Sequence, residues 1–216
     1  MACILLLIYI GFLTLLHVPS FQEKIGEEVG TYLSELTGSS VSIGRVDIGL
    51  LNQIVLSDLE LSDSVGKKIF SLDRAVARIE IMPLFHNELS LSSVQLFGVD
   101  AHLSRPSPSD ALNIQYLIDR FRSKDDKGPS MRLSLQTVVI RNSRLNYDIE
   151  SCPEQRGRLD QSHLHLDSLD FVCYVHRMSS DSLDIDINEL HFNESVSCLT
   201  VTDFTSRVEA YGKRIE

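Results

Sequence analysis

The 216-residue sequence contains no tryptophan, only six prolines and only four cysteines. The prolines are scattered, so no proline-rich linker divides the chain. The cysteines share no CxxC spacing, which argues against zinc-ribbon and thioredoxin-like chemistry. In an oxidising compartment the last three could pair in more than one way, whereas free thiols are the simpler expectation. The four residues are Cys3, Cys152, Cys173 and Cys198.

Basic residues are also scarce. The chain has 20 Lys and Arg against 30 Asp and Glu, a formal net charge of -10. This balance argues against nucleic acid, or an anionic membrane surface, as the main partner. A hydrophobic fraction of 43% with 23% charged residues is nevertheless typical of a folded protein. We therefore expect a folded chain of one or two modest domains that does not bind nucleic acid.

Catalytic motifs are missing: no GxSxG, HExxH, P-loop or GxGxxG pattern occurs. His163, His165 and Asp167 have a spacing that metals use on a strand, but they alternate with leucines and so fit a solvated strand face. The acidic stretch 184–189 resembles a calcium loop but lacks its glycine and its distal glutamate. We predict no catalytic residue, no metal and no cofactor, and therefore a protein that is not an enzyme.

The first 18 residues carry no Asp, Glu, Lys or Arg. As a helix they would reach roughly 27 Å, close to a hydrocarbon core of about 30 Å. We expect residues 1–19 to be an uncleaved transmembrane anchor. A cleaved signal peptide and a buried core helix are the alternatives, although the first would want a basic start and a small-x-small site. No basic residue precedes the segment, so its orientation cannot be predicted.

Residues 20–38 have helical periodicity. Apolar residues recur at Ile25, Val29 and Leu33, with charged residues between them, and Gly38 follows where a helix stops. We predict an amphipathic connector helix over 20–38 that packs against the first strands.

Beyond Gly38 the periodicity becomes alternating, and residues 39–216 are predicted to form one β-rich domain. The pattern apolar-x-apolar-x-x-apolar-x-apolar begins at six positions. A bulge or a tight corner at its double polar step would keep all four apolar side chains on one face. The copies begin at Val41, Ile54, Leu89, Leu133, Leu164 and Ile185.

The shared apolar surface has two interpretations. It is either the filled core of a packed sandwich or the floor of an open groove that holds acyl chains. A groove would leave these side chains partly exposed, and a sandwich would bury them. The candidate groove residues are Val41, Ile43, Ile54, Leu56, Leu89, Leu91, Leu133, Leu135, Leu164, Leu166, Ile185 and Ile187.

One helix is expected to interrupt the strands. Asp110 can cap a segment in which Leu112, Ile114, Leu117 and Phe121 have helical spacing, and residues 124–129 would end it. We predict a surface helix that covers an edge or end of the sheet.

Several short motifs follow one another in a fixed order along the first half of the chain. An apolar anchor ending in proline and a short helix carrying Gln22 come first, and Asn113-Ile114 at the inserted helix comes last. Between them lie Leu36-Thr37-Gly38, Val41-Ser42-Ile43-Gly44, Leu59-Glu60-Leu61-Ser62-Asp63 with Gly66, and the stretch from Leu89 to Val99. In the order of these motifs, the run from Thr31 to Phe121 resembles the N-terminal region of the AsmA/TamB family.

The resemblance implies a mainly β fold. An N-terminal transmembrane helix and an amphipathic helix would precede an elongated, bent antiparallel β-groove (β-taco-like) with one inserted surface helix. It also implies a bacterial inner-membrane anchor with the bulk of the chain in the periplasm. The implied function is inter-membrane phospholipid transport, or outer-membrane protein assembly and secretion, in a translocation and assembly module.

The implied partners are the inner membrane, phospholipid acyl chains and a BamA-like outer-membrane barrel, the last through a C-terminal region absent here. Family members are far longer, so we expect the β-rich domain to be truncated at its C-terminal end. The alternative function is a structural envelope scaffold or adhesin-like β-protein with a fully packed core.

Overall fold

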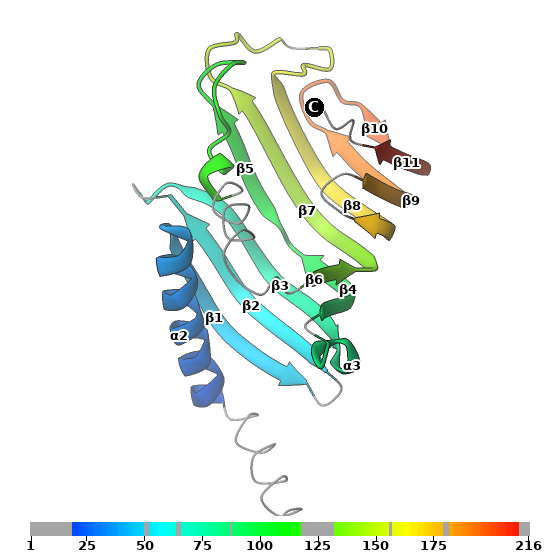
Figure 1. Cartoon of the computed structure of the whole chain (residues 1–216). Coiled ribbons are helices and arrows are strands. Elements are labelled where there is room, and N and C mark those ends of the chain that lie inside the picture. The colour runs from blue at the N-terminus through cyan, green and yellow to red at the C-terminus, as the bar shows by residue number, and fades with distance from the viewer. Residues whose placement is uncertain are drawn as a thin grey trace, which may run out of the picture.

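A computed structural model describes residues 19–49, 52–63, 66–86, 88–117, 132–155, 157–178 and 182–211. The described part is mainly β-structure with two short helical elements beside it (Figure 1). The helices are α2 (Pro19–Thr37) and α3 (Ile81–Leu84). The strands are β1 (Ser40–Gly49), β2 (Gln53–Ser62), β3 (Lys68–Glu80), β4 (Glu88–Phe97), β5 (Asp100–Arg105), β6 (Arg132–Leu135), β7 (Thr137–Ile149), β8 (His163–Met178), β9 (Ser182–Glu194), β10 (Thr200–Val201) and β11 (Ser206–Tyr211).

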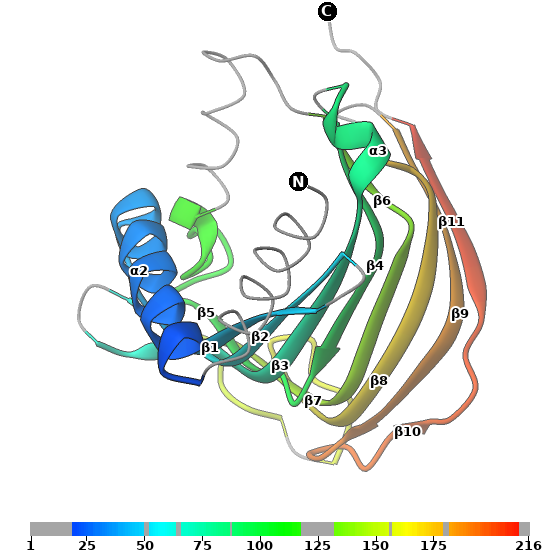
Figure 2. The same cartoon turned by 90° about the horizontal axis from the view of Figure 1, so that it is seen from below.

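All of these strands belong to one sheet, whose main order is β1-β2-β3-β4-β7-β8-β9-β10. β5 continues the line of β4 and pairs with β3 and β7, while β6 precedes β7 and pairs with β4. The sheet is strongly curved, so that it has one hollow and one outer face (Figure 2). The mainly β prediction is therefore confirmed, and the domain is one large sheet rather than a two-layer sandwich in the described residues.

The predicted antiparallel pairing is wrong in the middle of the sheet. β4 pairs in parallel with β6 and β7, and β5 pairs in parallel with β7. The chain leaves the end of β5 and returns at residue 132 beside the start of β4, so the next strand runs in the same direction. Alternation of apolar residues has the same period in both kinds of pairing, so the sequence pattern could not distinguish them.

The predicted bulge at the double polar step is confirmed by a register shift in three of the six copies of the repeat. The extra residues are Ser92, Ser168 and Asn188. In the β1 and β2 copies the register does not shift, because the pairing skips Gly44 and Asp58 together, and Asp58 has a left-handed torsion (φ 55°). In the sixth copy Gln136 separates β6 from β7. Each irregularity returns the following apolar side chains to the same face.

The predicted connector helix is confirmed as α2, which ends at Gly38 in the left-handed region (φ 70°). α2 lies along β1 at very close range: a Cβ on Gly26 would lie 2.8 Å from the Ile43 carbonyl oxygen. Ser34 Oγ accepts a hydrogen bond from the Val41 amide at 2.8 Å and donates to the carbonyl of Gly30. α2 therefore covers the β1 edge, and Ser34 satisfies an edge amide that another strand would otherwise bind.

The predicted inserted helix begins later than expected. Asp110 lies in a turn, where its amide donates to the Ser107 carbonyl, and the described helical residues are 115–117. Asn113 instead binds the end of β5, because its side chain contacts the Ser104 amide and the His102 carbonyl. The remainder of the predicted helix, including Phe121, lies outside the described residues.

Of the predicted membrane anchor at residues 1–19, residues 1–18 also lie outside the described residues, and Pro19 begins α2. Within the described ranges, no helix combines the length and the apolar character needed to cross a membrane.

Candidate functional site

Apolar side chains form unbroken rows across the sheet. A row is a set of residues, one from each successive strand, in which each residue is paired with the next. Paired residues have their side chains on the same face of the sheet, so all members of a row share a face. The first row is Ile48, Ile54, Ala77, Val94, Val138, Cys173 and Ile187. The second row is Val46, Leu56, Ala75, Leu96, Ile140, Phe171 and Leu190. The repeat therefore produces one continuous apolar surface across seven strands.

The structure brings the twelve candidate groove residues onto this surface. Val41 and Ile43 lie opposite Leu61 and Leu59, and Ile54 and Leu56 belong to the two rows above. In the parallel pair, Leu89 aligns with Leu133 and Leu91 with Leu135. On the other side, Leu164 lies opposite Tyr147 and Leu166 opposite Leu145, while Ile185 and Ile187 lie opposite Val175 and Cys173.

Most of these residues are only half-buried. Ile43, which lies beside α2, is buried with 4% of its surface exposed. Half-buried positions are Val41, Ile54, Leu56, Leu89, Leu91, Leu135, Leu164, Leu166, Ile185 and Ile187. Leu133 is placed here only by its alignment with Leu89. Partial exposure is the feature that distinguishes an open groove from a packed sandwich, in which both layers would bury these side chains.

The apolar surface lines the hollow side of the sheet. The turn at residues 115–117 lies on that side (Figure 2), and Leu117 and Ile114 form an apolar hollow of about 300 Å³ with Leu61, Phe70 and Leu103. Leu61 pairs with Phe70, and both side chains lie on the same face of the sheet as the two rows. The rows therefore face the same side as this turn. The described structure thus has a concave apolar surface covered by α2 and this turn near one edge only.

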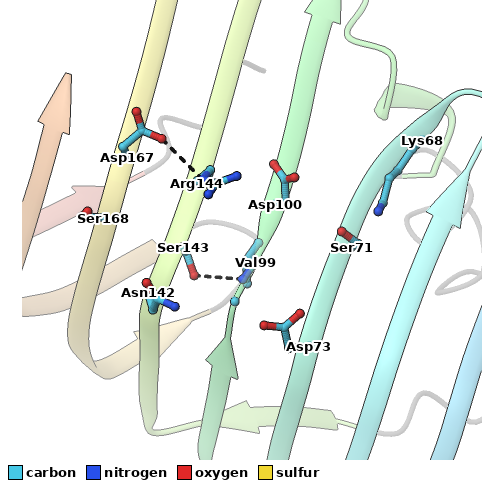
Figure 3. A pocket seen from close by; sticks show the side chains of 11 residues that line it. Lys68, Ser71, Asp73, Val99, Asp100, Asn142, Ser143, Arg144, Asp167 and Ser168 are labelled. Atoms are coloured by element: carbon cyan, nitrogen blue, oxygen red, sulfur yellow. Dashed lines mark hydrogen bonds and ion pairs between the residues drawn. The ribbon is translucent and has the colours of Figure 1, made fainter. Parts of the chain in front are cut away.

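The outer face carries many polar side chains, and a hollow on this face lies where the sheet is irregular. Gly98 and Asn142 have left-handed torsions (φ 63° and 50°) and lie side by side, in line with Asp58 and Ser168. Gly98 cannot be replaced without a shift, because a Cβ there would lie 2.0 Å from the Asp73 carboxylate. The hollow of about 490 Å³ is shown in Figure 3 and is lined by Lys68, Ser71, Asp73, Gly98, Val99, Asp100, Asn142, Ser143, Arg144, Asp167 and Ser168.

The charges around this outer hollow have mixed sign and engage one another. Arg144 lies 3.6 Å from Asp167, and the Ser143 hydroxyl accepts a hydrogen bond from the Val99 amide. Among the described residues, no three His, Cys, Asp or Glu side chains are arranged to hold a metal ion. We find no geometry in this hollow that favours a particular reaction or ligand.

The predicted histidine strand lies on the outer face, where its side chains bind neighbouring polar groups. His163 Nδ1–H donates to Asp148 at 2.9 Å, and Nε2–H donates to the Cys152 carbonyl at 2.9 Å. Because both ring nitrogens face acceptors, the hydrogen bond to Asp148, with that to Cys152, raises the pKa of His163 above its usual value. His165 contacts Asn146 and Asp148. These histidines hold β7 and β8 together.

Glu194, at the end of β9, is a buried anion that the sequence did not reveal. Glu194 is 1% exposed. Its carboxylate accepts hydrogen bonds from the backbone amides of His165, Val196 and Ser197. Burial raises the pKa of Glu194, but these hydrogen bonds outweigh that effect and lower it overall. The residue fixes the turn that follows β9.

Cys152, Cys173 and Cys198 are free thiols, so the simpler expectation for the cysteines is confirmed for these three. Only Cys173 is buried, and burial raises the pKa of its thiol. Its side chain belongs to the first apolar row, where it behaves as a small apolar residue.

The predicted packing of the connector helix against the first strands is confirmed, but sequence reasoning missed its close backbone contact with the β1 edge. Its signal is visible in the sequence as small residues at Gly26, Gly30 and Ser34, one helical turn apart. Small residues at this spacing let a helix approach another backbone closely.

Comparison with known proteins gives no relative: the chain matches no protein-family model and no curated protein.

Proposed function

We propose that this protein is a membrane-anchored groove that shelters the acyl chains of phospholipids, as in the envelope proteins of the AsmA/TamB type that its motifs resemble. The observation that carries the proposal is the half-exposed apolar surface on the hollow side of the sheet. A water-exposed apolar surface of this extent in a folded protein marks a site for an apolar ligand or partner.

An extended apolar molecule fits this surface better than a compact one. Two apolar rows run without interruption from β1 to β9, and neither contains a charged side chain. The described residues on this side offer no cluster of polar groups that would orient a small polar substrate. An acyl chain needs only apolar contact along its length, which such a surface supplies.

The remaining parts of the proposal rest on the resemblance and on the sequence. We place the chain in the bacterial envelope, anchored in the inner membrane through residues 1–18 and extending into the periplasm. Its role would be inter-membrane phospholipid transport or outer-membrane protein assembly and secretion, with a BamA-like barrel as the partner of a more C-terminal region. We assign no catalytic residue, in keeping with the expectation that the protein is not an enzyme.

Photo-crosslinking to lipid in cells tests the proposal. A photoreactive amino acid is placed at Leu56, Leu91 or Leu135, which are half-buried on the hollow side. Matched controls are Glu60 and Arg78, which are exposed on neighbouring strands with side chains on the outer face. Ser90 is unsuitable as a control, because it is 3% exposed and donates to Glu80.

Phospholipid adducts at the three hollow-side positions, and none at the controls, are the expected result. Equal labelling of both faces would mean non-specific contact with the membrane. The absence of adducts in a folded protein would contradict lipid binding and favour a scaffold whose apolar face is covered by protein.

A further inference from the structure

The most exposed apolar side chains of the described structure include three on a single helical turn. Met82 is 78% exposed, Phe85 80% and Ile81 55%, all in or directly after α3. The turn joins β3 to β4 at one end of the sheet (Figure 1). Its large apolar side chains point to water, which is costly unless they contact a partner.

The turn is held firmly at its base. The Ile79 amide donates to the Asn52 carbonyl, and the Asn52 side chain donates to the carbonyl of Ile79. Glu80 accepts hydrogen bonds from Ser90 on β4 and from Gln136 between β6 and β7. α3 therefore projects its apolar side chains from a fixed platform.

α3 lies at the same end of the sheet as the start of α2. Along the edge, Gly30 of α2 faces Val41, and Gln22 binds Asp47, so α2 runs antiparallel to β1 and begins near the end of that strand. That end pairs through Gln53 with Arg78, two residues before Glu80. α2 packs on β1, and β2 alone lies between β1 and β3 in the sheet.

The chain preceding α2 identifies the partner of this end. Residues 1–18 contain no charged side chain and join α2 directly at Pro19. The start of α2 and α3 both lie at the lower end of the sheet in Figure 1, on opposite sides of its hollow in Figure 2. A membrane that takes up residues 1–18 would lie at this end of the sheet, within reach of α3. The apolar residues of α3, with no Lys or Arg among residues 81–86, suit insertion among acyl chains rather than attraction to anionic headgroups.

We propose that α3 inserts Ile81, Met82 and Phe85 into the surface of the same bilayer that holds the N-terminal segment. The end of the concave apolar surface would then lie against the membrane. The protein would contact the bilayer through α3 as well as through the N-terminal segment. The inference rests on the proposed function in taking residues 1–18 as held in that bilayer and the bilayer as the source of the lipid.

The test uses the full chain reconstituted in vesicles of phosphatidylethanolamine and phosphatidylglycerol. An environment-sensitive fluorescent amino acid replaces Met82, and nitroxide-labelled lipids serve as quenchers. The matched control is the same probe at Leu159, which is 47% exposed in the loop at the opposite end of the sheet. The Met82 probe is expected to lose most of its fluorescence to the lipid quencher, and the Leu159 probe little.

A second variant keeps the probe at Met82 and carries Ile81→Ser and Phe85→Ser. These side chains are exposed, so folding should persist while quenching falls. Vesicles of neutral phosphatidylcholine should give the same quenching as the anionic vesicles, because the contact is apolar.

The proposal is overturned if the Met82 probe responds to lipid no more than the Leu159 probe. It is also overturned if Met82 is shielded from aqueous iodide without lipid, which would mean that the chain itself or a second copy covers α3. Crosslinking of lipid at Leu91 is scored separately. If α3 does not insert but Leu91 still forms lipid adducts, the proposed function stands and only the insertion is overturned. If α3 inserts but Leu91 forms no adducts, only the proposed function is overturned.

Discussion

The region around β1 and the region of β7 to β9 carry the same apolar repeat, but the repeat is buried to different degrees. In β1, Ile43 and Val46 are buried. In β7 to β9, the apolar residues of the repeat are all half-buried, Ile185 and Ile187 among them. α2 lies against β1, whereas no described helix packs on β8 or β9. The covering element, and not the strand sequence, decides whether the surface is closed.

The two regions also differ in how their strands are held. β1 is held by its close backbone contact with α2 and by the burial of its apolar side chains Ile43 and Val46. β7 to β9 depend more on polar pairs across the outer face, such as His163 with Asp148 and Arg141 with Glu189. We therefore expect the first region to respond to changes of side-chain volume, and the second to changes of pH.

The largest effect is expected from Gly26→Leu. A side chain here meets the Ile43 carbonyl oxygen at 2.8 Å, and backbone cannot move aside cheaply. The change should separate α2 from β1 and lower the free energy of unfolding by about 3 kcal/mol. Urea unfolding measures it, and Glu27→Leu, at an exposed position of the same helix, is the matched control. Equal stability of the two variants would contradict the close contact of α2 with the sheet edge.

The contrast between the two regions can be measured with one substitution made twice. Ile43→Ala removes a buried side chain and should cost about 2–3 kcal/mol, whereas Ile185→Ala, in the open region, should cost about 1 kcal/mol. Both residues belong to the same repeat and the same face, so only the covering differs. Equal losses in thermal or urea unfolding would mean that β9 is covered as well as β1.

A smaller effect is expected from Ser34→Ala. The variant leaves the Val41 amide at the sheet edge without its hydrogen bond, at a cost of about 1 kcal/mol. Hydrogen exchange of that amide should accelerate. Thr31→Ala is the control, because the Thr31 hydroxyl donates to a carbonyl within the helix on an exposed face. Unchanged exchange at Val41 would show that Ser34 does not protect the edge.

The smallest effect concerns pH and should be confined to the second region. His163 has a folded-state pKa above its ordinary value of 6.5, so its contribution to stability is complete below that value. The contribution is lost as pH rises through the raised pKa. Hydrogen exchange in the loop 150–162 should therefore accelerate with pH beyond the intrinsic rate, while β1 and β2 do not change. The His163→Gln variant, which cannot take up a proton, should abolish this dependence.

Much of the fold could be predicted from residue patterns because each pattern has a local cause. The connector helix follows from apolar spacing and Gly38, and the bulges follow from the double polar step in the repeat. Asp58 and Asn142 occupy left-handed positions that their short polar side chains tolerate. These are properties of a few neighbouring residues, so the sequence alone carries them.

The parallel pairing of β4 with β7, and the choice of the β1 edge as the surface that α2 covers, could not be predicted in the same way. Both depend on which distant segments meet, and alternating leucines and valines fit many partners equally well. The apolar surface was predictable as a set of residues, including Leu91 and Leu135. Its half-exposed state depends on which elements cover it, and that is a tertiary property.

The parallel pairing of β4 with β6 and β7, called the seam below, affects the order in which the chain folds. β1 to β5 form one meander and β6 to β11 another, and within each most strands pair with sequence neighbours. The seam instead joins Leu89 to Leu133 across a long connection, so its closure entropy must be overcome before its contacts form. Each meander can therefore assemble early and the seam late. An intermediate in which β4 and β7 have not yet paired would expose both strands as unpaired edges. Two chains could then pair β4 of one with β7 of the other and form a domain-swapped dimer.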